Sequence, residues 1–138
     1  MSEGEAFIAS WSTAVLEVEV AGGWVHPGVI AEARNCTVHL ITAWNPMGEI
    51  ASVEQNAAAD LRLAEQLDAA GIERHRWIGS DRNSPHFEEG WCVLGMGRSE
   101  AIALGAHHAQ LAIYEVDAES TLIAWCFDDR ILDVTQTA

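Results

Sequence analysis

The sequence predicts an α+β fold, a two-layer sandwich in which two main helices cover one face of a mostly antiparallel sheet. Three observations support this prediction. Between Thr13 and Val20, apolar residues alternate with glutamates, which is typical of a half-buried strand. After Ser52, apolar residues recur at helical spacing. From Thr37 onward, the predicted order is strand, helix, strand, strand, helix, strand, which is the ferredoxin-like split unit with flanking strands.

The first predicted strand is followed by a glycine- and proline-rich connection, residues 22–35. It has room for at most a short helix over Val29 to Arg34. The next strand, Thr37 to Trp44, is apolar on both faces, which indicates a central position in the sheet. A turn must follow at Asn45 to Gly48, because Pro46 keeps its predecessor out of the helical conformation.

Ser52 begins the most strongly patterned helix. Its hydroxyl lies three residues before Gln55, the spacing of a capping box. Gly71 is expected to end the helix. The predicted buried stripe consists of Val53, Ala57, Leu61, Ala64 and Leu67.

The second half of the chain predicts shorter elements. Ser99 is expected to cap a second helix that ends near Gln110, and Gly79 to Pro85 should form a surface loop. Residues 128–138 are weakly patterned. The predicted strands are His75 to Ile78, Trp91 to Met96, Leu111 to Val116 and Thr121 to Phe127.

Length and composition indicate one globular domain over residues 1–138, since 49% of the residues are hydrophobic and 20% are charged. The longest apolar runs fall well short of the roughly 18 residues that span a membrane. The N-terminus is acidic and the first basic residue is Arg34, which does not fit a secretory signal. We therefore expect a cytoplasmic protein without membrane contact.

The chain is strongly acidic, with a formal net charge of −14, and all seven of its basic residues are arginines. The absence of lysine excludes Schiff-base chemistry and a lysine-containing phosphate loop. Nucleic acid is not an expected partner, because its phosphates would meet a negative surface. The acidity indicates either a solubilising surface or a surface that binds a basic protein.

Several motifs occur in one order along the chain: Thr42-Ala43-Trp44-Asn45-Pro46, then Asn56, then the Gly79 loop with Glu88 and Glu89, then Gln110 to Ile113. In this order the chain resembles a bacterial family numbered three-two-nine-three in the series of domains of unknown function. The resemblance covers about Val38 to Tyr114. It implies which positions matter, and it implies no reaction, cofactor or partner. The segment His107-His108 departs from the bulky apolar residue expected there.

Polar amides gather where a strand ends and a helix begins, which is where free N–H groups favour an anion or a carbonyl. Asn45 and Asn56 could bind a ligand there, or they could close the turn and brace the loop. Gln110 could reach the same pocket or satisfy buried backbone groups. Trp44 could stack on a planar ligand or pack in the core.

Glu88 and Glu89 beside His86 form the one cluster with potential for acid–base catalysis. Adjacent residues of a strand point to opposite faces, so one glutamate is expected to face the pocket and the other the solvent. We expect no metal site and no cofactor, because the spacing of six histidines and three cysteines matches no ligand motif.

These observations predict a small binding or regulatory module. Its expected ligand site comprises Trp44, Asn45, Asn56, Gln110 and Glu88 or Glu89, with Glu89 preferred. The alternative is a small enzyme that uses His86 with Glu88 or Glu89 for acid–base chemistry. A third hypothesis is an inhibitor-like or antitoxin-like module that binds a protein partner through its acidic surface. A homodimer also remains open, since sheets of this type often pair through a face or an edge.

Overall fold

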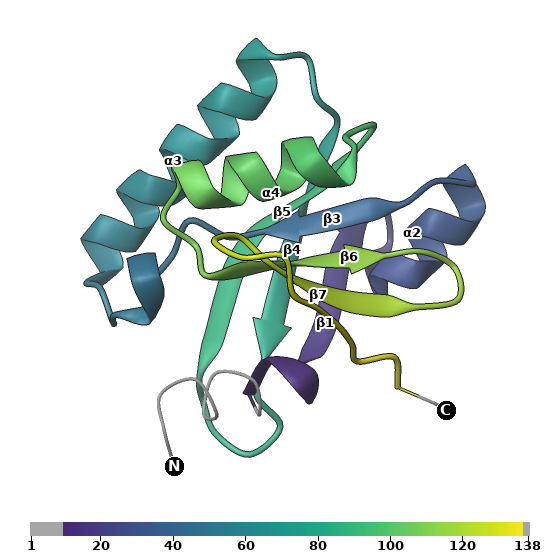
Figure 1. The fold of residues 1–138 in the computed structure, drawn as a ribbon, viewed down its shortest axis with the longest axis horizontal. Helices are drawn as coiled ribbons and strands as arrows, with labels where there is room; N and C mark the ends of the chain where they lie inside the picture. Colours follow the sequence, from purple (N-terminus) through teal and green to yellow (C-terminus); the bar gives the residue numbers. More distant parts are fainter. Residues whose placement is uncertain (1–9, 137–138) are drawn as a thin grey trace.

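A computed structural model describes residues 10–136 of the chain (Figure 1). Its strands and helices follow one another as a mixed α+β sequence, which confirms the α+β part of the prediction. In chain order they are β1 (Val15–Val20), β2 (Gly23–Val25), α2 (Pro27–Arg34), β3 (Val38–Ile41), the short 3-10 helix η1 (Pro46–Gly48), α3 (Val53–Ala69), β4 (Arg74–Ser80), β5 (Phe87–Leu94), α4 (Arg98–His107), β6 (Ala112–Val116), β7 (Thr121–Trp125) and β8 (Ile131–Asp133).

The described strands form one sheet of eight strands in the order β2-β1-β4-β5-β3-β6-β7-β8. Every neighbouring pair is antiparallel. Strand β3 lies inside the sheet, where Val38 pairs with Leu94 of β5 and with Val116 of β6. All four of its residues are buried, as the sequence predicts for a central strand.

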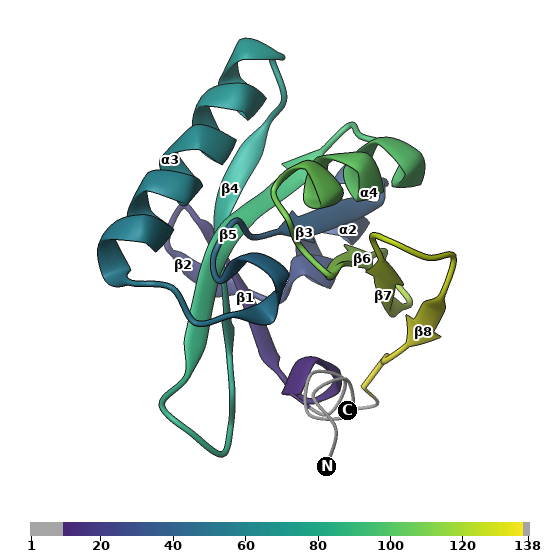
Figure 2. The same ribbon diagram turned by 60° about the vertical axis from the view of Figure 1, so that its left-hand side comes forward.

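The sheet has an apolar core on each face. Helices α3 and α4 lie on the same side of the sheet (Figures 1 and 2) and contribute to one core with Ile41 and Val93. The shorter helix α2 contributes Ile30 and Ala31 to the opposite core, beside Leu40. The two main helices therefore share a face, and α2 covers part of the other.

Helix α3 begins as predicted, with Ser52 and Gln55 in a capping box. The Gln55 N–H donates to Ser52 Oγ at 3.1 Å, and the Ser52 N–H donates to Gln55 Oε1 at 2.9 Å. The predicted buried stripe is partly wrong, because Val53 and Leu61 are 81% and 58% exposed and Ala57 is exposed as well. The helix instead turns Asn56, Ala59 and Leu63 inward together with Ala64 and Leu67. Contacts of the Asn56 amide at the end of β3 orient the helix this way.

Other boundaries differ from the sequence prediction. Strand β5 begins at Phe87 rather than Trp91, so Glu88 and Glu89 lie within it. The N-cap of α4 is Gly97 and not Ser99, and it forms no side-chain cap bond, because glycine has no side chain that could accept one. Strands β2 and β8 were not predicted, since each has only three residues. Among the helices of residues 10–136, none combines the length and apolar character needed to cross a bilayer.

Candidate functional site

Asn45 is the centre of a buried hydrogen-bond network at the end of β3. It adopts the left-handed conformation with φ of 50°, which asparagine tolerates better than most residues. Its N–H donates to Asn56 Oδ1 at 2.9 Å. Its own Oδ1 accepts from the Ala51 N–H at 3.0 Å and from Asn56 Nδ2 at 3.2 Å. The two asparagines thus fix the turn to the start of α3, and both are 7% exposed.

The remaining amide group of Asn45 holds a carboxyl. Asn45 Nδ2 donates to Glu88 Oε1 at 3.0 Å, so both ends of the Asn45 side chain are occupied. Burial raises the pKa of Glu88, while the Asn45 hydrogen bond and nearby His86 act in the opposite direction. The network therefore presents a desolvated carboxyl whose only hydrogen-bond partner among residues 10–136 is a neutral amide.

The other motif residues brace the same turn. Gln110 Nε2 donates to the carbonyl oxygens of Trp44 at 3.0 Å and His108 at 3.2 Å. Thr42 Oγ1 donates to the Glu89 carbonyl oxygen at 2.7 Å and accepts from the Trp44 N–H at 3.0 Å. These contacts join the end of β3 to β5 and to the end of α4, and they leave the polar groups of the turn engaged within the protein.

Trp44 lies beside Phe87, with ring centroids 5.6 Å apart. Its indole nitrogen is buried and has no hydrogen-bond partner in the described part of the chain. The Glu89 side chain points to the face opposite Glu88, because residues alternate along a strand. The structure thus brings Asn45, Asn56 and Glu88 together. It does not bring the side chain of Glu89 to them.

A small cavity of about 30 Å³ lies on the Glu88 side of the sheet, and His86, Asp81 and Trp77 also line it. A larger cavity of about 700 Å³ shares three lining residues with it, Trp11, Ala14 and Tyr114. Neither lining includes Trp44, Asn45, Asn56 or Gln110. The open space therefore borders the carboxyl that the amides hold, and not the amides themselves.

Aromatic rings surround the small cavity. Trp11 and Tyr114 stack with centroids 4.5 Å apart, and Trp77 meets Tyr114 edge-on at 6.0 Å. The Tyr114 hydroxyl donates to the Trp11 carbonyl oxygen at 2.7 Å, and burial raises the pKa of Tyr114. Sequence reasoning missed Trp11, Trp77 and Tyr114 as site residues. They come from three separate segments, and only the sheet order places them together.

The position of Trp77 depends on a glycine. The Trp77 indole N–H donates to the Ile41 carbonyl oxygen at 3.2 Å. Gly90 of β5 lies between them, where a Cβ would collide with that oxygen and with the indole nitrogen. A bare backbone at position 90 therefore lets an indole from β4 reach β3.

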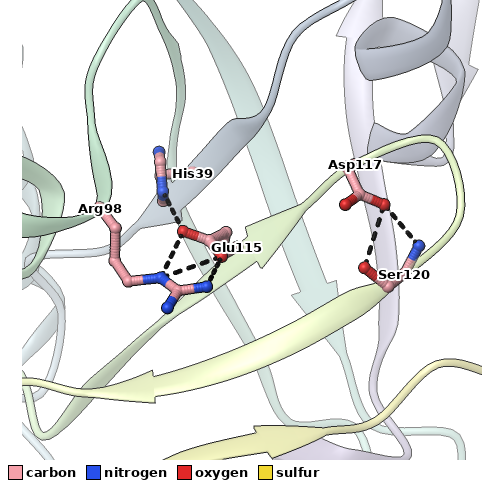
Figure 3. A network of polar contacts seen from close by, with 5 residues as sticks. All are labelled: His39, Arg98, Glu115, Asp117 and Ser120. Carbon is pink, nitrogen blue, oxygen red and sulfur yellow. Dashed lines mark hydrogen bonds and ion pairs between the residues drawn. The ribbon is translucent and has the colours of Figure 1, made fainter. Parts of the chain in front are cut away.

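A second polar cluster lies on the face of the sheet that α3 and α4 cover, opposite to the face of Glu88. His39 Nε2 is 2.9 Å from Glu115 Oε1, and Arg98 donates to both oxygens of Glu115, the shortest contact being 2.6 Å (Figure 3). The Arg98 guanidinium is the main cause that lowers the pKa of Glu115, whereas burial lowers the pKa of His39. In the same figure, Asp117 accepts from the Ser120 N–H and hydroxyl at 2.7 and 3.0 Å and closes the turn after β6.

Two of the three cysteines, Cys92 and Cys126, are poorly suited to thiol chemistry. Burial raises the pKa of the Cys92 thiol to about 12 and that of Cys126 to about 11. Both thiols are therefore protonated at neutral pH, and the thiolate is the reactive form. Across residues 10–136, no three His, Cys, Asp or Glu side chains are grouped so that they could hold a metal ion.

Fold and site together define an antiparallel α+β protein that holds a half-buried carboxyl against an aromatic-lined cavity. The family model described as protein of unknown function (DUF3293) matches residues 41–113, more than half of the chain, and the protein belongs to this family. The match confirms the resemblance found in the motifs. No curated protein and no solved structure shows significant similarity to the chain.

Proposed function

We propose that the protein is a small-molecule binding module whose ligand occupies the two adjoining cavities beside Glu88. The observation that carries this proposal is the hydrogen bond of 3.0 Å from Asn45 to the Glu88 carboxyl. Asn56 and the Ala51 N–H hold Asn45 in turn. Preorganised polar groups beside a cavity with aromatic walls are typical of ligand sites.

In this proposal the amides position the site and do not contact the ligand. The Asn45 side chain already donates once and accepts twice within the protein. A ligand that displaced those bonds would leave buried amides unpaired, which costs about 1–3 kcal/mol for each group. The ligand contact therefore moves from the amides to the carboxyl of Glu88.

We also infer the ferredoxin-like arrangement for the middle of the fold. It is supported by the adjacent strands β4-β5-β3-β6 and by helices α3 and α4, which connect β3 to β4 and β5 to β6. Both helices contribute to the same core. The outer strands and α2 then extend this unit and provide the wall of the larger cavity.

The test is a thermal-shift screen of the purified protein against amino acids, amines, nucleotides and sugars. It is repeated with Glu88→Gln and with Glu89→Gln as the matched control on the opposite face. A ligand at a hundred times its Kd should add about 2.7 kcal/mol. We expect a compound whose shift is lost in Glu88→Gln and kept in Glu89→Gln. A screen without any shift, or a shift that both variants keep, would contradict the proposal.

A second candidate function is acid–base catalysis at the same place. Burial raises the pKa of Glu88, and His86 lines the same small cavity. A carboxyl protonated at a higher pH than usual can act as a general acid. Here Glu88→Gln would retain affinity for the identified compound and lose its turnover, whereas a pure binder shows no turnover in either form.

A further inference from the structure

We propose that the ligand of the Glu88 site carries an ammonium group, which binds between the Glu88 carboxylate and the rings of Trp11, Trp77 and Tyr114. This inference rests on the proposed function and names its ligand class. The class is a primary or methylated amine on an apolar or mixed body. The ammonium group occupies the small cavity, and the body extends into the large one.

The first argument is the missing counter-ion. Glu88 is bonded to the neutral amide of Asn45, and no arginine forms an ion pair with it in residues 10–136. Nearby His86 lowers the pKa of Glu88 through its charge, but no hydrogen bond or ion pair joins these two side chains. Arg82, the arginine that lines the large cavity, instead donates to Gln136 at 3.2 Å. A half-buried carboxylate without an ion-pair partner loses part of its hydration, and an incoming ammonium would compensate that loss.

The second argument is the set of aromatic rings. Trp11, Trp77 and Tyr114 line the cavity that Glu88 also lines. Indole and phenol rings attract cations through their negative faces, and the attraction is largest where water is excluded. Aromatic rings around a carboxylate favour a cation over an anion or an uncharged polar group.

The third argument is size and surrounding charge. A cavity of about 30 Å³ accepts a head group of roughly one or two water molecules and excludes a ring. The larger cavity of about 700 Å³ has room for the rest of the ligand, with Glu17, Asp117 and Glu119 at its wall. The net charge of −14 attracts cations from a distance.

The experiment compares three compounds with the same carbon skeleton: butylamine, butanol and butyrate. Each is titrated into the full-length protein, and the indole N–H signals of the tryptophans are followed by nuclear magnetic resonance. We expect butylamine to bind at least tenfold more tightly than the alcohol or the acid. Glu88→Gln should weaken amine binding at least tenfold, and Glu89→Gln should leave it unchanged.

Two sets of outcomes separate this inference from the proposed function. If the amine binds no better than the alcohol, or if Glu88→Gln binds it normally, the ammonium inference is overturned. The proposed function then survives if the screen still finds a compound lost in Glu88→Gln. If the amine does not bind and the screen finds no compound, both fail.

Discussion

Glu88 and Glu115 are two carboxyls on interior strands of one sheet, and their surroundings act on them in opposite ways. Glu115, on the α4 face, receives the Arg98 guanidinium, and its pKa is lowered. Glu88, on the opposite face, receives one neutral amide, and burial raises its pKa. Both residues are glutamates on interior strands, so the difference comes from the partner. The arginine lowers the pKa of Glu115, and the neutral amide does not compensate the charge of Glu88 in the same way.

The largest expected effect comes from making Glu115 resemble Glu88. Arg98→Met removes the cation and leaves the carboxylate with His39 alone. We expect a loss of about 2 kcal/mol in unfolding free energy, measured by urea denaturation. The loss is smaller than for a fully buried ion pair, because the Arg98 side chain is 47% exposed and solvent screens its charge. The matched control is Arg34→Met, which breaks the exposed pair with Glu73 and should change stability little. Equal effects of the two variants would contradict the comparison.

A somewhat smaller effect is expected from releasing the amides that hold Glu88. Asn56→Ala removes two hydrogen bonds to Asn45 and leaves the buried Asn45 N–H without its acceptor. We expect a loss of about 1.5 kcal/mol, seen as an earlier thermal midpoint. Glu65→Ala serves as a control on the same helix, since its side chain is exposed and forms none of the hydrogen bonds that hold the turn. If Asn56→Ala melts like the parent protein, then Asn56 does not brace the turn.

The protonation of His39, which contacts Glu115, tests the surroundings of the second carboxyl. Burial lowers the pKa of His39 below 6.5 in the folded protein, so the unfolded chain takes up a proton first as the pH falls. The contribution of neutral His39 to the free energy of unfolding is complete above pH 6.5. It is lost as the pH falls from 6.5 through the pKa of His39 in the folded protein. A titration followed by nuclear magnetic resonance should show that the His39 ring takes up its proton only below pH 6.5. A ring protonated above pH 6.5 would contradict this prediction.

The smallest expected effect is a gain. The folded pKa of Glu88 is raised above 4.5, so the unfolded chain ionises first and the parent protein loses stability as the pH rises through that window. Glu88→Gln keeps an oxygen for Asn45 Nδ2 and removes the charge. We expect its thermal midpoint at pH 7 to rise by about 2 °C, with no difference below pH 4. A fall at pH 7 would indicate that a cation within the protein already compensates the carboxylate.

The sequence predicted most of the sheet and helices, because local patterns carry that information. Alternation of apolar residues with glutamates identified β1, and a run that is apolar on both faces identified β3. The Ser52 capping box identified the start of α3. The inward face of α3 was partly misjudged, since a polar residue, Asn56, is turned toward the core by a partner on another element. The spacing of apolar residues along the chain cannot predict a hydrogen bond between polar residues of two different elements.

The site was predicted in part for a related reason. The motif residues around Asn45 do lie together, as their order along the chain suggests. The cavity they support could not be predicted, because Trp11, Trp77 and Tyr114 meet only after strands from both ends of the chain have paired. The orientation of Glu88 depended on where β5 begins, and strand boundaries are weakly encoded in short apolar runs.

The indole of Trp77 crosses the bare backbone of Gly90 to reach the Ile41 carbonyl oxygen. One side chain thereby spans three strands, β4, β5 and β3. If β5 slid by one residue against its neighbours, the side chain of Glu89 or Trp91 would lie where the indole passes. The crossing therefore disfavours a pairing of β5 that is shifted by one residue, because a side chain in place of Gly90 would collide with the indole.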